Sequence, residues 1–263
     1  MNISILISSY NKGKYIKDCI ESCLSQNYNN FEVILSDNYS TDETDEILSK
    51  YKHKIKIFKN KKISNFSAIN QIDQLVKAFK HSNGEIVCLL DADDIFDSKK
   101  IVEVSNFFTN NKSIDTLFDL PMIKVNELYK KFENKTKMQN KIWPTIIPSS
   151  SISMKRSFFE ECISVGLFSN YNILEIDFRI NVYARIIKNN FKILNTHLNV
   201  YRQVDDSIMS SHRKYSKFWW QKRLQAHQFM KEWIEKNNQS YSTVDYLITK
   251  IIVSIFNLNK LFK

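Results

Sequence analysis

Hydrophobic and polar positions follow two alternating periodicities along the first hundred residues. Four short apolar or alternating runs have the length and pattern of β-strands: residues 3–8, 31–36, 54–59 and 85–90. Three stretches between them place apolar residues three or four positions apart, as on one face of a helix: residues 14–26, 41–51 and 66–80. This repetition predicts an α/β fold with a mainly parallel sheet covered by helices on both faces.

The regular alternation ends near residue 110. After it we expect a strand at 115–125, a mobile Lys-rich loop at 129–141, a strand and a short helix within 149–162, a helix at 173–190 and a last strand at 191–203. From Asp205 the apolar spacing is helical to the end. The chain should therefore form one large domain at 1–205, with halves at 1–110 and 111–205, and a C-terminal helical extension at 206–263.

Polar residues follow three of the predicted strands, in the segments 8–13, 36–44 and 91–97. Ligands of such sheets bind beyond the carboxyl ends of the strands. We therefore expect the three segments to converge on one cleft.

The most acidic of these segments belongs to "GEIVCLLDADDIFD", where an apolar run opens into Asp91, Asp93 and Asp94. Carboxylates this close repel one another unless a positive charge lies among them. A hard divalent cation with oxygen ligands would remove the repulsion. The alternative is a carboxylate that only caps the next helix; it suits Asp97, stays open for Asp94 and leaves Asp91 and Asp93 unexplained.

Composition narrows the classes of function. The formal net charge of +10 favours anionic partners, and without an Arg-rich block nucleic acid ranks below phosphorylated substrates and membrane surfaces. The three glycines, Gly13, Gly84 and Gly166, lie too far apart for a dinucleotide-binding or phosphate-loop motif.

The cysteines and the N-terminus suggest a cytoplasmic protein. The four cysteines show no framework spacing, so we expect buried, reduced thiols. The first residues, "MNISILISSY", carry no basic start of a signal peptide, and no segment reaches the roughly 18–20 apolar residues of a membrane span.

The order and spacing of two segments are informative, namely "SILISSYNKGKYIKDCIESCLSQNYNNFEVILSDNYSTDETDEI" and "GEIVCLLDADDIF". In this order and spacing, over approximately residues 3–108, the chain resembles the family 2 glycosyltransferases. The resemblance implies a GT-A-type Rossmann-like fold, in which 1–110 binds the nucleotide-sugar and 111–205 binds the acceptor. It also implies inverting transfer of a sugar from a nucleoside-diphosphate donor, assisted by Mn²⁺ or Mg²⁺. The acceptor would be a saccharide or a lipid-linked molecule, as in bacterial surface-polysaccharide synthesis.

The resemblance also assigns donor-binding residues. Ser8 and Tyr10 match positions that border the base, and Asp37 matches the first of two carboxylates that contact the nucleoside. Asp91 and Asp93 match the outer positions of the D-x-D motif. There the later Asp ligates the metal, and the earlier one serves the ribose or sugar side and counts as a second metal candidate.

Two positions depart from the family pattern. Asn38 stands where many members have a second carboxylate, so base preference cannot be carried over. The helix before the fourth strand also lacks the Arg of many members. Lys61, Lys62 or Arg202 would then supply positive charge to the diphosphate, and the sequence does not choose among them.

An acceptor hydroxyl needs a general base. By resemblance the base is Asp177, with Glu175 in reserve, although Ile176 separates the two where the family has adjacent acids. The alternative is an acidic residue favoured by the helix dipole. A histidine could complete the metal shell, and His212 is a better candidate for this than His197. The simpler interpretation of each is a histidine that lies on the surface or packs against a strand.

The C-terminal region combines aromatic and basic residues, including Trp219, Trp220, Phe229 and Trp233, with a broad apolar face on its last helix. One interpretation is packing on the catalytic domain or on a second copy of the protein. The other is an interfacial helix in peripheral contact with a membrane.

Two other functions remain open from the sequence. A non-catalytic nucleotide-sugar-binding scaffold could have the same fold. A haloacid-dehalogenase-type phosphatase also ends a strand in Asp-x-Asp, but it usually has that strand near the N-terminus, whereas three strand units precede Asp91 here.

Overall fold

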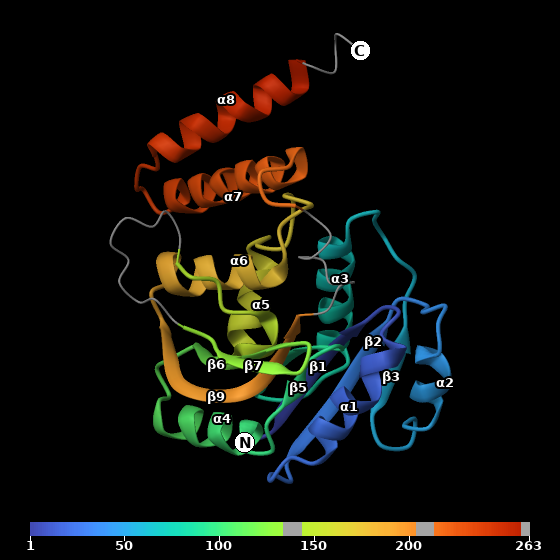
Figure 1. Ribbon diagram of the computed structural model, residues 1–263. Helices are drawn as coiled ribbons and strands as arrows, with labels where there is room; N and C mark the ends of the chain where they lie inside the picture. Colours follow the sequence, from blue (N-terminus) through green and yellow to red (C-terminus); the bar gives the residue numbers. More distant parts are fainter. Residues whose placement is uncertain (134–143, 204–212, 259–263) are drawn as a thin grey trace.

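A computed structural model describes residues 1–133, 144–203 and 213–258 (Figure 1). The first half forms a parallel sheet in the order β3-β2-β1-β4, from β1 (Ile3–Ser9), β2 (Phe31–Asp37), β3 (Lys56–Lys59) and β4 (Ile86–Asp91). Its connecting helices are α1 (Gly13–Leu24), α2 (Thr44–Ser49) and α3 (Ser67–Lys80). The strand–helix alternation predicted from the sequence is confirmed.

The second half extends the same sheet with mixed pairing, in the order β4-β8-β6-β9-β5. Its strands are β5 (Ile95–Phe96), β6 (Thr116–Val125), β7 (Leu128–Lys131), β8 (Ile152–Lys155) and β9 (Phe191–Gln203). β8 is antiparallel to both β4 and β6, whereas β9 is parallel to β6. The helical elements are α4 (Lys100–Asn110), the 3₁₀ turn η1 (Ser149–Ser151), α5 (Arg156–Ser164) and α6 (Ile176–Val182), which continues as a π-helix over Tyr183–Ile187.

Two apolar cores lie on opposite faces of the sheet. Along β4, Val87 and Leu89 belong to one core, while Cys88 and Leu90 belong to the other, because successive strand residues point to opposite faces. Burial on both faces explains why this strand is continuously apolar. All four cysteines are buried and free, as expected from their spacing.

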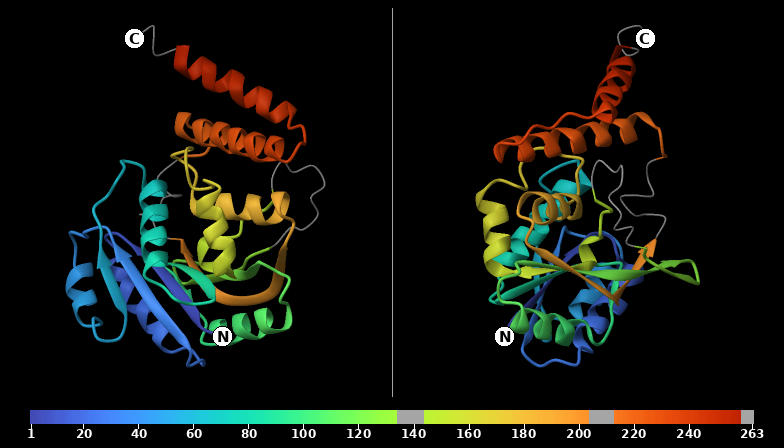
Figure 2. Two further views of the ribbon diagram at one scale, coloured as in Figure 1. Left: turned by 180° about the vertical axis from the view of Figure 1, so that it is seen from behind. Right: turned by 90° about the vertical axis from the view of Figure 1, so that its left-hand side faces the viewer.

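The C-terminal part consists of α7 (Lys217–Lys236) and α8 (Val244–Leu258). α7 packs onto the helices above the sheet and buries Phe229, Met230 and Trp233 in the same core as β4 and α6. α8 lies on the outer side of α7, as both views of Figure 2 show. The interfacial interpretation is thus wrong for Phe229 and Trp233. No helix among the described residues is long and apolar enough to cross a membrane.

Four sequence expectations need correction. The expected loop at 129–141 begins as β7, because residues 128–131 pair with β6; residues 134–143 lie outside the described part. The helix expected at 173–190 begins only at Ile176. In the described residues 213–258, helical structure begins at Lys217 and is interrupted between α7 and α8. The two-residue strand β5 was not expected, since its pairing with β9 joins distant segments.

Candidate active site

The three polar strand ends converge, as predicted, on one cavity of about 600 Å³. Ser8 lies at the end of β1 and Tyr10 follows it, Asn38 follows β2, and Asp91 ends β4 with Asp93 just beyond it. The second half of the chain closes the cavity with residues from η1, α6 and β9, which are Ser149, Glu175, Asp177, Tyr201 and Arg202. A cavity of this size suits a small-molecule ligand.

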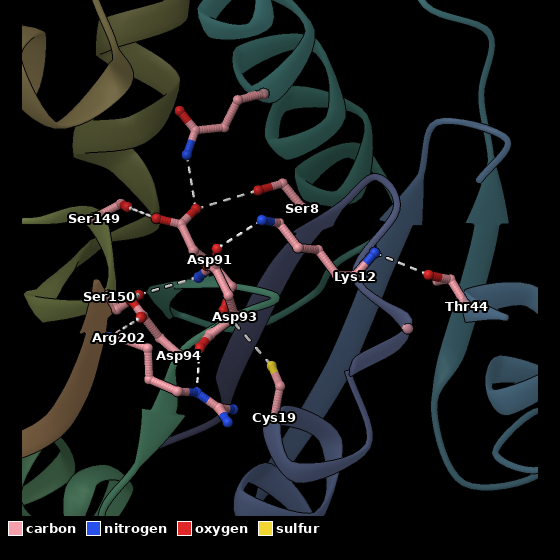
Figure 3. Close-up of polar contacts among 12 residues, drawn as sticks. Ser8, Lys12, Cys19, Thr44, Asp91, Asp93, Asp94, Ser149, Ser150 and Arg202 are labelled. Atoms are coloured by element: carbon pink, nitrogen blue, oxygen red, sulfur yellow. Dashed lines mark hydrogen bonds and ion pairs between the residues drawn. The ribbon is translucent and has the colours of Figure 1, made fainter. Parts of the chain in front are cut away.

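Asp91 is held by neutral donors from three different elements. Its carboxylate accepts hydrogen bonds from Gln71 Nε2 at 2.7 Å, from Ser8 Oγ at 3.4 Å and from Ser149 Oγ (Figure 3). Burial, and then the nearby charge of Asp93, raise the pKa of Asp91 above its ordinary value. An additional positive charge at this site would therefore stabilise the ionised form of Asp91.

Asp93 already has a basic neighbour. Lys12 Nζ lies 2.9 Å from Asp93 Oδ2, and Lys12 comes from the loop between β1 and α1 (Figure 3). Arg202 Nε, at the end of β9, donates to the Asp93 carbonyl oxygen. Cations from the two halves of the chain thus meet at the end of β4.

Asp94 has a structural role. It is completely buried and accepts hydrogen bonds from Ser150 Oγ at 2.5 Å and from the Arg202 backbone N–H at 2.9 Å. Burial raises the pKa of Asp94 well above its ordinary value. The helix-cap interpretation is wrong for Asp94. Asp97 Oδ1 accepts a 2.9 Å hydrogen bond from the N–H of Lys99 just before α4, but among the described residues no side chain caps α4 itself, whose N-cap is Lys99.

Asp177 lies in the first turn of α6, and its Oδ1 accepts a 2.6 Å hydrogen bond from the Phe178 N–H. Burial, and then the charge of Glu175, raise the pKa of Asp177 to about 7, against a lowering effect of Lys222. A carboxyl group with that pKa is suited to exchange protons at neutral pH. Glu175 forms an ion pair with Lys222 of α7.

Buried polar atoms at the cavity also lack partners. Asn38 Oδ1, Gln71 Oε1 and Arg202 Nη2 have no hydrogen-bond partner among the described residues, although all three residues line the cavity. Buried polar groups are normally paired. These atoms therefore favour a polar ligand.

Most of the residues singled out in the sequence line this cavity: Ser8, Tyr10, Asn38, Lys62, Asp91, Asp93, Glu175, Asp177 and Arg202. Asp37 is buried behind it, where its carboxylate accepts from the Ser40 N–H at 2.8 Å and from Ser40 Oγ at 2.6 Å. Lys62 Nζ lies 3.2 Å from the centroid of the Tyr10 ring, and Lys61 lines a neighbouring hollow. His197 does not line the cavity, and His212 lies outside the described residues.

Sequence reasoning missed Lys12, Gln71, Ser149 and Lys222. Lys12 stands in the polar segment after the first strand, so its position pointed to the cleft. The other three approach the acids only through tertiary packing, which no local pattern indicates.

Among curated proteins, an uncharacterized glycosyltransferase of Haemophilus influenzae is 30% identical over 183 residues, covering 61% of this chain and 71% of that protein. The Escherichia coli UDP-Glc:alpha-D-GlcNAc-diphosphoundecaprenol beta-1,3-glucosyltransferase WfaP is 33% identical over 111 residues, 42% of each chain. An uncharacterized glycosyltransferase of Nostoc sp. is 28% identical over 131 residues, 48% of this chain but only 39% of its own length. The chain thus spans less than half the length of most of the curated relatives it matches.

Solved structures show the same fold. Staphylococcus aureus TarS 1–349, in complex with UDP-GlcNAc, aligns with a TM-score of 0.61 over 89% of this chain and 72% of its own, at 17% identity. The Pyrobaculum calidifontis mannosyltransferase PcManGT, in complex with GDP-Man and Mn²⁺, aligns at 0.55 over 96% and 69%, at 14% identity. The fold is therefore that of GT-A glycosyltransferases, as expected. The family model "Glycosyl transferase family 2" matches residues 4–163, more than half of the chain, so the protein belongs to glycosyl transferase family 2.

Proposed function

We propose that this protein is a metal-dependent, inverting glycosyltransferase that moves a sugar from a nucleoside-diphosphate donor to a hydroxyl of a saccharide or lipid-linked acceptor. One observation carries the proposal: the carboxylates of Asp91 and Asp93 and that of Asp177 line the same cavity but come from opposite halves of the chain. Inverting transfer needs this division, because the base approaches the anomeric carbon from the side opposite the leaving diphosphate.

The acidic end of β4 fits a divalent cation. The described residues hold no cluster of three side chains that could bind a metal, so Asp91 and Asp93 would supply the protein ligands and leave other positions to phosphate oxygens and water. Burial, and then the charge of Asp93, raise the pKa of Asp91, so a cation at this position would favour its ionised form. A bound Mn²⁺ or Mg²⁺ would act as a Lewis acid toward the departing diphosphate.

The base side is suited to deprotonate the acceptor. In the proposed reaction, the acceptor oxygen forms a bond to the anomeric carbon as the bond from that carbon to the diphosphate breaks, and the hydroxyl proton passes to Asp177. Arg202, whose Nη2 has no hydrogen-bond partner within residues 1–133, 144–203 and 213–258, would bind the diphosphate or another polar part of the donor. Ser8, Tyr10 and Asn38 would border the nucleoside, and Asp37 would support this region from behind through Ser40.

The proposed setting is the cytoplasmic side of a membrane, in surface-polysaccharide synthesis. The relative WfaP carries a diphosphoundecaprenol substrate in its name, which supports a lipid-linked acceptor. α8 exposes an apolar face: Val244, Leu247, Ile248, Ile251 and Ile255. This face would provide peripheral membrane contact or self-association. Co-sedimentation with anionic vesicles, compared with the molar mass from light scattering, distinguishes the two.

Incubation with UDP-, GDP-, CDP- and dTDP-sugars tests the activity, with Mn²⁺, with Mg²⁺ and with EDTA. We expect thermal stabilisation by one donor together with Mn²⁺, and slow release of the matching nucleoside diphosphate with water as acceptor. Stabilisation without turnover for any acceptor would support the non-catalytic scaffold instead. Phosphate release from simple phosphate esters would support the phosphatase, which the family match disfavours.

A further inference from the structure

α7 contacts the segment that precedes the proposed base at two points besides the Glu175 ion pair. Gln225 Oε1 accepts a 3.0 Å hydrogen bond from the backbone N–H of Ile173, and Glu232 Oε2 accepts a 2.6 Å hydrogen bond from Tyr171 Oη. Together with Lys222, these residues fix residues 171–175 along about three turns of α7. α7 therefore contacts the loop that leads into α6, the helix that carries Asp177.

Apolar packing keeps α7 in this position. The centroid of the Phe229 ring lies 5.6 Å from the centroid of the Tyr171 ring and 5.9 Å from that of the Phe178 ring. Phe178 is the residue after Asp177. Phe229 is completely buried. A helix with such an anchor cannot shift along the base segment without opening a cavity in the core.

The Lys222–Glu175 pair is the contact closest to the chemistry. Only 24% of the Lys222 side chain and 12% of the Glu175 side chain are exposed. Solvent therefore screens this pair less than a surface pair. Without Lys222, the Glu175 carboxylate would be unpaired beside Asp177, and two acids would compete for one proton.

We propose that α7 is an integral part of the active site and that Lys222 is a positioning residue, which holds Glu175 as an ionised partner and so leaves Asp177 as the base. The proposal rests on the function proposed above. It assigns distinct tasks to the two acids, one binding Lys222 and one accepting the acceptor's proton.

Among the described residues, four charged or titratable groups are coupled electrostatically to Asp177. Glu175 and Asp91 oppose its ionisation, while Lys222 favours it. Tyr201 of β9 also faces this charge, since Asp177 contributes to the raised pKa of the Tyr201 hydroxyl. Of these groups, only Lys222 is cationic and comes from the C-terminal helices.

The test compares the pKa of the Asp177 carboxyl group in the wild type with its pKa in Lys222→Met. Carbon-13 NMR titration of the carboxyl groups in the protein alone, with the Asp177 signal assigned through Asp177→Asn, gives its pKa without any turnover. We expect the pKa to rise by about one unit or more from its wild-type value near 7 when the cation is lost. Because the base must be ionised, kcat/KM for donor hydrolysis should fall about tenfold below pH 7 and recover above pH 9.

Three variants make the test specific. Lys222→Arg should keep the wild-type profile, since it retains the charge. Lys222→Met combined with Glu175→Gln should restore the titration and most of the activity, because the competing charge is gone. Lys231→Met is the matched control, since Lys231 lies on the same helix but pairs with the exposed Glu235 at 2.5 Å.

An unchanged Asp177 titration in Lys222→Met would overturn the proposal, whether or not activity falls. An inactive double variant would overturn it as well, because Glu175 would then be the base. If the Asp177 titration shifts as expected in Lys222→Met but the wild-type protein hydrolyses no donor in the panel, the result would instead contradict the proposed function and leave the electrostatic role of Lys222 in place.

Discussion

The two groups of acids around the cavity obtain their compensating partners from different places. At the end of β4, Asp91 is bound by hydroxyl and amide groups, and Asp93 pairs with Lys12, which follows the neighbouring strand β1. In contrast, Glu175 depends on Lys222, from a helix that begins about forty residues later in the chain.

In the proposed mechanism, this difference would separate donor binding from proton transfer. The donor side is stabilised within the sheet, where adjacent parallel strands fix the positions of the side chains. The base side is stabilised by packing of α7 onto the sheet's covering helices. Changes on the base side should therefore reduce transfer with little effect on donor affinity, and changes at β4 should do the reverse.

The largest effect should come from Asp177→Asn, which removes the proposed base and keeps its shape. We expect transfer or donor hydrolysis to fall about 10³-fold or more, because general-base catalysis contributes about 10²–10⁴-fold. Donor affinity, measured by calorimetry with Mn²⁺, should stay within about twofold. Turnover at the wild-type rate would move the base to Glu175 or elsewhere.

Asp93→Ala should have the next largest effect, on the donor side. We expect metal-dependent donor affinity to fall about 100-fold, since a metal site depends strongly on each ligand and its support. Asp97→Ala is the matched control, because Asp97 lies in the same acidic segment but its exposed carboxylate bonds to the Lys99 N–H and does not line the cavity. Equal Mn²⁺-stimulated affinity in Asp93→Ala and wild type would remove Asp93 from the metal site.

The smallest effect should come from Lys12→Met, which tests whether the ammonium group competes with the cation for Asp93. A cation that approaches Asp93 must displace Lys12 from its ion pair. We expect the apparent Mn²⁺ affinity to rise about threefold to tenfold, a change of roughly 1 kcal/mol that is typical of a partly exposed pair. A weaker donor affinity in this variant would instead make Lys12 a ligand of the donor's phosphates.

The sequence predicted the position of the residues after β1, β2 and β4 better than that of the contacts around Asp177, for a physical reason. The strands β1, β2 and β4 are consecutive units of one repeating pattern, so their carboxyl ends must meet and Asp91 and Asp93 must face the cleft. Asp37 belongs to the same pattern yet points to Ser40, because local hydrogen bonding in the turn takes its carboxylate. Backbone periodicity places a strand end but does not determine the direction of each side chain.

The base side depends on contacts that no local pattern records. Asp177 was chosen by resemblance, and the structure places it on the cavity, but its role stays a prediction. Lys222 gave no signal in the sequence, because it is one lysine among many on an amphipathic helix. Its contact with Glu175 follows from the burial of Phe229 and Trp233, which sets the rotation of α7.

The serine triplet of η1 has a consequence for how the two halves are aligned. Ser149 donates to Asp91, Ser150 donates to Asp94, and Ser151 accepts from Asn199 of β9 at 2.7 Å. Ser150 Oγ also accepts a 3.1 Å hydrogen bond from the Asp91 N–H, so the three serines bind Asp91, Asp94 and Asn199 immediately before β8 pairs with β4. If the pairing of β8 with β4 shifted by one residue, all three serine hydroxyls would lose their present hydrogen-bond partners. The triplet therefore helps to specify a single register between the two halves of the sheet.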